Sequence, residues 1–186
     1  MQEEITLITG NKDKIAEVQI IMPYIQAKKF DLPEIQSLDM REIVAHKIQQ
    51  ALALCSAPII VEDTAFYLDC LKNQDGSPGL PGPFIKWFLH TIGNRELFEI
   101  ARLKKCTRGV AKTVVGYAPD AHSIHFFEGK VHGDVVLPEG EFGFGWSAVF
   151  KVDGCDVALN HMLIEDRVKV NQRGIAIQQL KDFLKK

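Results

Sequence analysis

The first residues of the chain change abruptly from an apolar, strand-like run to a charged, helix-competent one. Residues 5–9, Ile-Thr-Leu-Ile-Thr, are followed by Gly10-Asn11 and then by a predicted helix over Lys12–Met22, whose apolar residues recur at helical spacing. A strand that passes through a tight turn directly into a helix is the opening of an α/β unit, in which helices cover a sheet. This feature restricts the fold class more than any other in the chain.

The pattern up to residue 104 continues the alternation of strands and helices. Glu42 follows Asp39 as in a capping box, and the next helix is expected to end before Pro58. A Gly/Pro-rich loop is expected over residues 76–83. The other expected elements are a strand over Ile25–Phe30, a buried strand over Ile59–Val61, a helix with Pro83 in its first turn and Phe84, Phe88 and Ile92 along one side, and a short helix over Arg95–Lys104.

After residue 110 the sequence favours β-structure. Strands are expected over Thr113–Ala118, Ser123–Glu128 and Val131–Leu137, with turns at Pro119-Asp120 and Gly129-Lys130. Phe142–Val152 suits a strand or an extended loop, and Asn171 is a candidate cap for a final helix that carries Ala176, Leu180 and Leu184. The predicted fold is α/β, a mixed central β-sheet flanked by helices, with two lobes around a substrate cleft in a single domain over residues 1–186.

Composition narrows the possible partners. The 186 residues carry a net charge of −2, whereas a protein that binds the nucleic-acid backbone normally has a basic excess. The four cysteines form no C-x-x-C pair, which argues against structural zinc and favours reduced thiols. We find neither a leader-like segment nor an apolar run long enough to span a membrane. These observations predict a cytoplasmic protein with no nucleic-acid or membrane partner.

The turn after the first strand has the features of an anion site. Backbone N–H groups at a helix N-terminus lack partners, and the helix dipole is positive there. Lys12 and Lys14 add positive charge, and Thr9 and Asn11 add hydrogen-bonding side chains. The Walker spacing is absent. We expect a nucleotide or another phosphorylated molecule here; the alternative is a Gly-Asn turn that only links two elements.

Two acidic segments are candidates for a metal site. Glu62-Asp63-Thr64 directly follows the predicted strand, where open α/β sheets place ligands, and the two acids should point to opposite faces. Glu34 lies on a path made rigid by Pro33 and is the candidate for a second acid. Two carboxylates can hold Mg²⁺ or Mn²⁺ against phosphate oxygens. The alternative is that both segments are simply solvated.

Other residues can contact a ligand but have common structural explanations. Lys47 and Lys86 lie on predicted helices and can be lysines whose stems cover apolar surface. Gly143-Phe144-Gly145-Trp146 offers aromatic faces for a base, or core packing. Arg173, at the start of the last helix, can donate to a carbonyl oxygen or be merely exposed.

The motifs become specific when they are taken together and in order. They resemble the inosine triphosphate pyrophosphatase family over residues 5 to about 180. The resemblance is carried by Thr9-Gly10-Asn11-x-x-Lys14-x-x-Glu17, Asp31-Leu32-Pro33-Glu34-Ile35-Gln36, Val61-Glu62-Asp63-Thr64, Gly79-Leu80-Pro81-Gly82-Pro83-Phe84-Ile85-Lys86-Trp87-Phe88, Phe142-Gly143-Phe144-Gly145-Trp146 and the closing Arg173.

The resemblance implies a homodimeric, metal-dependent enzyme. It would hydrolyse non-canonical purine nucleoside triphosphates (ITP, dITP, XTP) to the monophosphate and pyrophosphate, and so remove them from the nucleotide pool. It assigns three catalytic residues, of which Glu34 and Asp63 would organise Mg²⁺ (or Mn²⁺), Asp63 would also position or deprotonate water, and Lys14 would hold the triphosphate. The implied substrate-binding residues are Thr9, Gly10, Asn11, Lys14, Lys47, Thr64 and Lys86 toward the phosphates, Phe144, Gly145, Trp146 and Ser147 around the base, Arg167, Gln172, and Arg173, the last at the 6-oxo group.

Departures from the family pattern are concentrated near the base-binding end. Ser147-Ala148 stands where the family usually has Asp-Pro, and Asn171-Gln172-Arg173 where it has Ser-His-Arg. The upstream lysine is replaced by Arg167, or is Lys169 if the register slips. Ala65 stands where a glycine or a small residue is common. We therefore expect hydrolysis to be intact and base recognition to be altered.

Two alternatives stay open from the sequence. The chain can be a nucleotide-binding sensor that lost turnover through the changes at 147 and 172, although retention of Glu34 and Asp63 favours the enzyme. It can also be a pyrophosphatase with altered base specificity, including one that acts on modified pyrimidine triphosphates.

Overall fold

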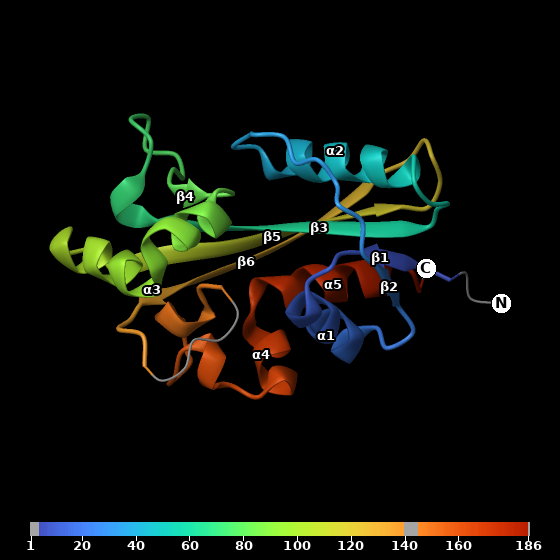
Figure 1. Ribbon diagram of the computed structural model, residues 1–186. Helices are drawn as coiled ribbons and strands as arrows, with labels where there is room; N and C mark the ends of the chain where they lie inside the picture. The colour runs from blue at the N-terminus through green and yellow to red at the C-terminus, as the bar shows by residue number, and fades with distance from the viewer. Residues whose placement is uncertain (1–3, 140–144, 186) are drawn as a thin grey trace. The chain divides into compact units, whose positions relative to one another are not determined.

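The computed structural model describes residues 4–139 and 145–185 and is shown in Figure 1. The described strands form a seven-stranded mixed sheet in the order β2-β1-β3-β5-β6-β7, with β4 paired to β3. The elements are β1 Thr6–Ile8, α1 Lys12–Ile21, β2 Gln26–Lys28, α2 Met40–Leu52, β3 Ile59–Leu68, β4 Pro81–Gly82, α3 Ile85–Leu103, β5 Arg108–Ala118, β6 His125–Val135, β7 Phe150–Val152, α4 Ile164–Val170 and α5 Gln172–Phe183. The predicted α/β class with a mixed sheet is confirmed.

The chain folds into two compact units. Unit 1 comprises residues 1–64, 113–129 and 172–186, and unit 2 comprises residues 65–112 and 130–171. The expected substrate cleft stays a prediction. Among the described residues, no helix is long and apolar enough to cross a membrane.

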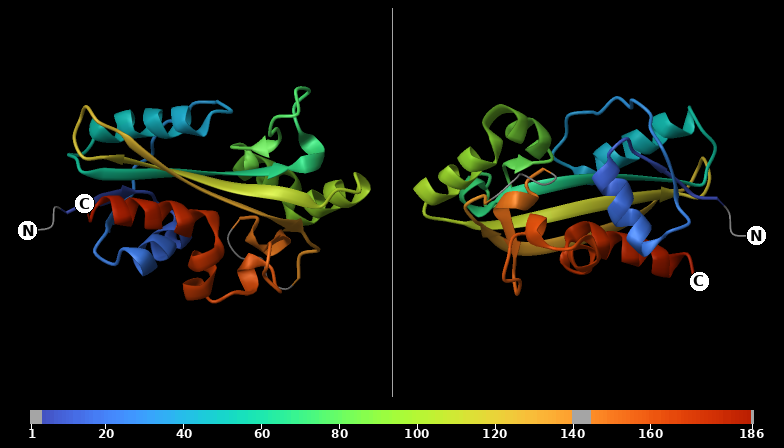
Figure 2. Two further views of the ribbon diagram at one scale, coloured as in Figure 1. Left: turned by 180° about the vertical axis from the view of Figure 1, so that it is seen from behind. Right: turned by 60° about the horizontal axis from the view of Figure 1, so that its bottom comes forward.

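Unit 1 contains the parallel part of the sheet. β1 pairs in parallel with both β2 and β3, and Leu7 is level with Ala27 on one side and Ile60 on the other. Helices α1 and α5 pack together on one face and α2 covers the opposite face, as the views of Figures 1 and 2 agree. The core between the sheet and the α1–α5 pair contains Ile5, Leu7, Val18, Met22, Ile25, Ile60, Val115, Tyr117, Ala176, Ile177 and Leu180. This packing fixes the end of β1 and the start of α1.

Unit 2 is organised around an aromatic cluster. The ring of Phe66 stacks on Trp146, with centroids 4.9 Å apart, and meets Phe150 edge-on at 5.0 Å. The antiparallel pairing of β6 with β7, in which Val135 is level with Phe150, supports this cluster from the sheet.

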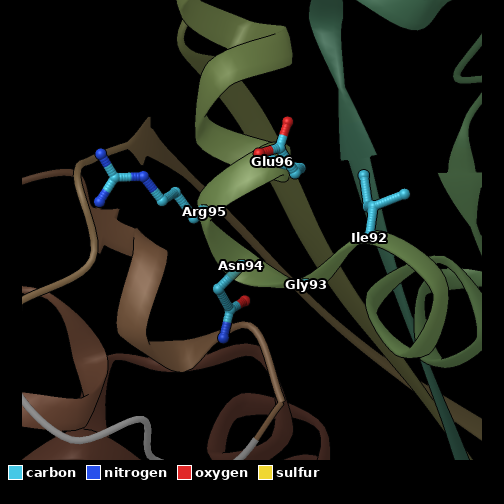
Figure 3. A pocket seen from close by; sticks show the side chains of 5 residues that line it. All are labelled: Ile92, Gly93, Asn94, Arg95 and Glu96. Carbon is cyan, nitrogen blue, oxygen red and sulfur yellow. The ribbon is translucent and has the colours of Figure 1, made fainter.

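Helix α3 is broken at Gly93. This glycine has φ 76° and ψ 176°, a conformation outside the helical region, so the two shorter helices predicted on either side of it are confirmed as two halves of one kinked element. The Asn94 side chain donates to the Gly145 carbonyl at 2.9 Å just after the kink. A surface hollow of about 370 Å³ is lined by Ile92–Glu96 (Figure 3) and includes none of the predicted site residues.

β3 is longer than the sequence pattern predicts. β3 continues through Glu62-Asp63-Thr64 to Leu68, so these residues lie inside the strand rather than after it. They begin where the paired part of β1 stops, and β4 pairs with β3 further along, at Phe66 and Tyr67. β3 also lies next to β5 in the sheet, so the strand has partners beyond the part that pairs with β1.

The predicted turn at Gly129-Lys130 is wrong. β6 runs unbroken from His125 to Val135. Gly129 has a different purpose, since a Cβ at this position would overlap the carbonyl oxygen of Gln172 at the start of α5. The glycine thus lets a helix start approach the strand closely.

Smaller differences concern helix ends. Asp39 caps α2 by accepting from the Arg41 N–H, but Glu42 accepts from the Ser37 hydroxyl instead of completing a capping box. α2 ends at Leu52, well before Pro58, and α3 begins at Ile85 rather than at Pro83. α4 was not expected from the sequence, and β7 is the strand within the residues predicted as strand or loop.

The close approach at Gly129 gives a stability prediction. Gly129→Ala should lower the free energy of unfolding by about 3 kcal/mol, because the added methyl group forces the start of α5 away from β6. Urea unfolding followed by circular dichroism measures this change. Lys130→Ala, at the neighbouring exposed position, should be close to wild type. Equal stabilities of the two variants would contradict the packing role.

Candidate functional site

The predicted anion turn has its side chains in place. The Thr9 hydroxyl accepts from the Asn11 N–H at 3.2 Å. The Asn11 side-chain oxygen accepts from the N–H groups of Asp13 and Lys14, at 3.0 and 3.2 Å, and so caps α1. The Lys29 side chain lies against Gly10, where a Cβ would come within 2.8 Å of it. Two helix N-terminal donors are thus already paired, and two lysines, Lys14 and Lys29, stand beside the turn.

Lys14 is held by a buried carboxylate. Its Nζ lies 2.6 Å from Oε1 of Glu62, and the two side chains are 17% and 1% exposed. Burial alone would raise the pKa of Glu62, but the nearby charges of Arg173 and Lys14 outweigh it and hold the pKa at about 2. Glu62 is therefore an ionised group in the interior of unit 1.

Arg173 connects this pair to α1 from the other side. Its Nε donates to Oε2 of Glu62 at 3.2 Å, its Nη1 to Glu17, and its Nη2 to the Thr64 hydroxyl at 3.3 Å. Arg173 and Glu17 are 2% and 3% exposed. We call Lys14, Glu62, Arg173 and Glu17 the buried ion ring. Its two positive and two negative charges sum to zero.

The second acidic group lies on the other face of β3. Lys47 of α2 places its Nζ 3.0 Å from Oε1 of Glu34 and 3.9 Å from Oδ1 of Asp63. One ammonium group thus sits beside both carboxylates that the sequence predicted to share a metal. We call Glu34 and Asp63 the carboxylate pair.

The pKa values in this group follow from burial and charge. Burial lowers the pKa of the Lys47 ammonium, but the carboxylates of Asp63 and Glu34 outweigh burial, and the pKa is raised overall. Burial also raises the pKa of Asp63, more than the neighbouring Lys47 and Lys14 lower it. The pKa of Lys47 thus lies above its ordinary value, which favours the charged ammonium, and the pKa of Asp63 lies above its ordinary value, which favours the neutral carboxyl.

Strand alternation separates the two groups. Glu62 faces α1 and α5, whereas Asp63 faces Lys47 of α2, as predicted from the opposite directions of neighbouring residues in a strand. Thr64 returns to the side of Glu62 and its hydroxyl pairs with that of Thr113 at 2.9 Å. Three consecutive residues of β3 therefore serve both faces.

The donor set fits a small divalent cation. Carboxylate oxygens are the preferred ligands of hard cations, and Mg²⁺ is commonly held by one or two carboxylates together with water and phosphate oxygens. Glu34, Asp63 and Lys47 together carry a net charge of −1, and the two acids already share one cationic group. No cluster of three or more metal-binding side chains occurs among residues 4–139 and 145–185.

Comparison with known proteins shows which family the chain belongs to. Residues 5–183 match the Ham1 family. The chain belongs to the Ham1 family. An inosine triphosphate pyrophosphatase of Kluyveromyces lactis is 35% identical over 191 residues, covering 97% of this chain and 95% of that protein. Inosine triphosphate pyrophosphatase 2 of Trypanosoma cruzi is 37% identical over 183 residues, covering 96% and 90%.

Solved structures support the Ham1 fold. A Ham1 protein from Coxiella burnetii superposes with a TM-score of 0.78 at 18% identity, covering 98% of each chain. The Staphylococcus aureus Ham1 protein has a TM-score of 0.71 at 21% identity, with the same coverage. At identities of 18% and 21%, these two similarities are evidence for the fold alone.

The predicted base-side residues of this Ham1-family chain belong mostly to unit 2. Trp146 is 8% exposed and packs in the aromatic cluster, and the buried Ser147 hydroxyl has no hydrogen-bond partner within residues 4–139 and 145–185. Lys86, which the resemblance places toward the phosphates, is also in unit 2, and its Nζ lies 5.0 Å from the centre of the neighbouring Trp87 ring. Gly145 has φ 60°, and Phe144 lies outside the described residues.

The remaining predicted residues lie near the chain's last two helices. Arg167 is in α4, where its alternative, Lys169, pairs with Asp166 at 2.8 Å on the surface. Gln172 starts α5 in unit 1, and its buried Oε1 has no hydrogen-bond partner in the part of the chain that the structure describes. Base contacts by these residues stay predictions.

Sequence reasoning assigned no role to Glu17, Lys29 or Thr113. Glu17 is part of a motif that carries the resemblance, and the structure shows that it is buried and paired with Arg173. The signal was available in its position three residues after Lys14, because residues i and i+3 share a helix face. Lys29 and Thr113 carry no comparable signal, since their proximity to the site arises from folding alone.

The lowered pKa of Glu62 gives a pH prediction. A folded pKa of about 2 against an ordinary 4.5 means that its ion pairs stabilise the fold fully above about pH 4.5 and that this contribution is lost as the pH falls to 2. The difference corresponds to about 3 kcal/mol. Glu62→Gln should therefore be less stable than wild type by roughly this amount at pH 7, and the gap should narrow at pH 3.

Urea unfolding of the metal-free proteins at pH 7 and pH 3 measures the difference in free energy of unfolding between wild type and Glu62→Gln. Glu165→Gln, at an exposed position of α4, controls for removal of any one carboxylate. A gap for Glu62→Gln that is the same at pH 7 and pH 3 would contradict the assigned ionisation.

Proposed function

We propose that the chain hydrolyses inosine triphosphate and related non-canonical purine nucleoside triphosphates to the monophosphate and pyrophosphate. The observation that carries the proposal is the carboxylate pair gathered around Lys47 in the same unit as the cationic turn at Thr9–Lys14. The names of similar Ham1-family members, at about 35% identity over nearly the whole chain, support the substrate class. dITP and XTP are included on the resemblance alone.

The assigned roles follow from charge and position. Lys14, whose ammonium group pairs with Glu62, directs positive charge toward a polyphosphate at the Thr9-Gly10-Asn11 turn. Glu34 and Asp63 would hold Mg²⁺ (Mn²⁺ is the alternative), which when bound neutralises phosphate oxygens. Lys47 keeps the two acids near each other and adds a further positive charge.

Asp63 is the residue that we assign to the attacking water. A carboxylate can act as general base toward an attacking water, and burial raises the pKa of Asp63 in the metal-free protein. At 19% side-chain exposure it also remains accessible to water. Proton transfer from water to Asp63 would accompany attack of the water oxygen on the α-phosphorus. The bond from that phosphorus to the oxygen bridging the α- and β-phosphates would break, releasing pyrophosphate and leaving the monophosphate.

Replacement of Asp63 tests catalysis directly. Asp63→Asn should lower turnover of ITP by a factor of about 10³ or more, because it removes both a metal ligand and the proton acceptor. Nucleotide binding should persist. Pyrophosphate release measured with Mg²⁺, with Mn²⁺ and with EDTA gives turnover, and calorimetry gives binding.

Asp156→Asn, an exposed change outside the site, is the matched control and should retain turnover. Turnover that survives either EDTA or Asp63→Asn would contradict the assigned mechanism. A wild-type protein that binds nucleotide without releasing pyrophosphate would instead support the sensor alternative.

We further propose that base recognition differs from the family pattern. Among the described residues, neither the buried hydroxyl of Ser147 nor the buried Oε1 of Gln172 has a hydrogen-bond partner, which supports a role for each in contacting a polar group. Ser147 is neutral where the family usually has an aspartate, so a negatively charged acceptor is missing. A site that depends on hydrogen bonds can reject an analogue by roughly 10⁴–10⁵, and loss of an acceptor weakens that rejection.

A nucleotide panel tests this loss of selectivity. The ratio of kcat/KM for ITP over ATP or GTP should lie well below the roughly 10⁴ that a fully paired site can give, and Ser147→Asp should raise the ratio. Pyrophosphate release from ITP, XTP, GTP, ATP and modified pyrimidine triphosphates provides the values. Sharp wild-type discrimination that Ser147→Asp leaves unchanged would contradict altered recognition.

Homodimer formation is also proposed, and its support is the resemblance. Light scattering of the purified protein measures it.

A further inference from the structure

We propose that Glu17 and Arg173 are positioning residues for the phosphate side of the site and act on Lys14 through Glu62. The proposal rests on the proposed function, in which Lys14 holds the triphosphate. It assigns Arg173 a task different from the base contact that the resemblance implies.

The first link is between Lys14 and Glu62. With Oε1 of Glu62 2.6 Å from the lysine Nζ, this carboxylate determines where the ammonium group lies. An ammonium group has three donors, so Lys14 retains donors for phosphate oxygens while Glu62 holds it. Removing the carboxylate would return a flexible side chain to many rotamers.

The second link is between Glu62 and Arg173. A buried carboxylate keeps a fixed orientation only if its oxygens are paired, and Oε2 of Glu62 accepts from Nε of Arg173 at 3.2 Å. Glu62 is 1% exposed, so water cannot replace a lost partner. Arg173 therefore orients the carboxylate that orients Lys14.

The third link closes a ring. Nη1 of Arg173 donates to Glu17, which lies on α1 three residues after Lys14. The chain of contacts thus leaves α1 at Lys14, passes through β3 and α5, and returns to α1 at Glu17. A closed ring restrains both the side chain of Lys14 and the position of the helix that carries it.

The guanidinium group of Arg173 is directed toward unit 1 residues. Its Nε, Nη1 and Nη2 donate to Glu62, Glu17 and Thr64, and the side chain is 3% exposed. A residue that reads the base would change selectivity when it is replaced. A residue that positions Lys14 would change the affinity for phosphate groups equally for every base.

The decisive experiment is a double-mutant cycle between Glu17→Gln and Lys14→Met. Glu17→Gln should lower kcat/KM by about 10- to 100-fold, by the same factor for ITP, XTP and GTP. In the Lys14→Met background, Glu17→Gln should cause little further loss, because the residue through which it acts is gone. Arg173→Lys should behave like Glu17→Gln.

Lys181→Met is the matched control. Lys181 donates to the Ile21 carbonyl at 2.7 Å and so provides another polar contact between α5 and α1, outside the ring. This variant should lose stability while retaining kcat/KM. Thermal unfolding of all variants shows whether each is folded at the assay temperature.

Three results would overturn the proposal. They are additive losses in the cycle, a change of the ITP-to-GTP ratio in Glu17→Gln, and unchanged kcat/KM in a folded Glu17→Gln. Calorimetry with inorganic pyrophosphate, which carries no base, separates this proposal from the proposed function. If the wild type hydrolyses no nucleotide, the proposed function fails, yet weaker pyrophosphate binding in Glu17→Gln still supports the ring, and equal binding overturns it.

Discussion

The buried carboxylate of Glu62 is the group on which the arrangement of unit 1 depends. Moving an ionised carboxylate into an interior costs several kcal/mol unless partners offset the lost hydration. Arg173 and Lys14 provide this compensation from two helices, at 3.2 and 2.6 Å. The same contacts that stabilise the charge also bring α1, β3 and α5 to one place. Stability and the geometry of the anion turn are therefore consequences of one set of ion pairs.

Because neighbouring residues of a β-strand point to opposite faces, Glu62 and Asp63 lie in different surroundings. Glu62 belongs to the neutral buried ion ring. Asp63 lies on the other face of β3, beside Lys47 of α2, which also pairs with Glu34, and a net negative charge remains there. Neighbouring carboxylates thus have opposite pKa shifts, lowered for Glu62 and raised for Asp63. An acid that stays ionised next to one that accepts protons more readily is a common arrangement in active sites.

The sequence predicted the local features of the fold well, because they depend on neighbouring residues. The strand–turn–helix start and the Asn11 turn were expected from spacing. The family resemblance paired Glu34 with Asp63 but placed Lys47 toward the phosphates, whereas its Nζ lies beside both carboxylates. The length of β3 and the unbroken course of β6 were not expected from the sequence. A strand's extent depends on which partners lie beside it, and Gly129 resembles a turn residue unless the helix packed against it is known. Glu17 was missed for the same reason, since its partner is 156 residues away.

The neutrality of the buried ion ring also limits which substitutions its four residues can accept. Loss of any single member leaves an unbalanced charge inside the protein, so a neutral substitution at one position is tolerated only with a compensating change at its partner. Replacing a whole pair by apolar residues of similar volume leaves no unpaired charge inside the protein, but it would remove Lys14 or the residues proposed to position it. Homologues that lack one of these charges should lack a second of opposite sign.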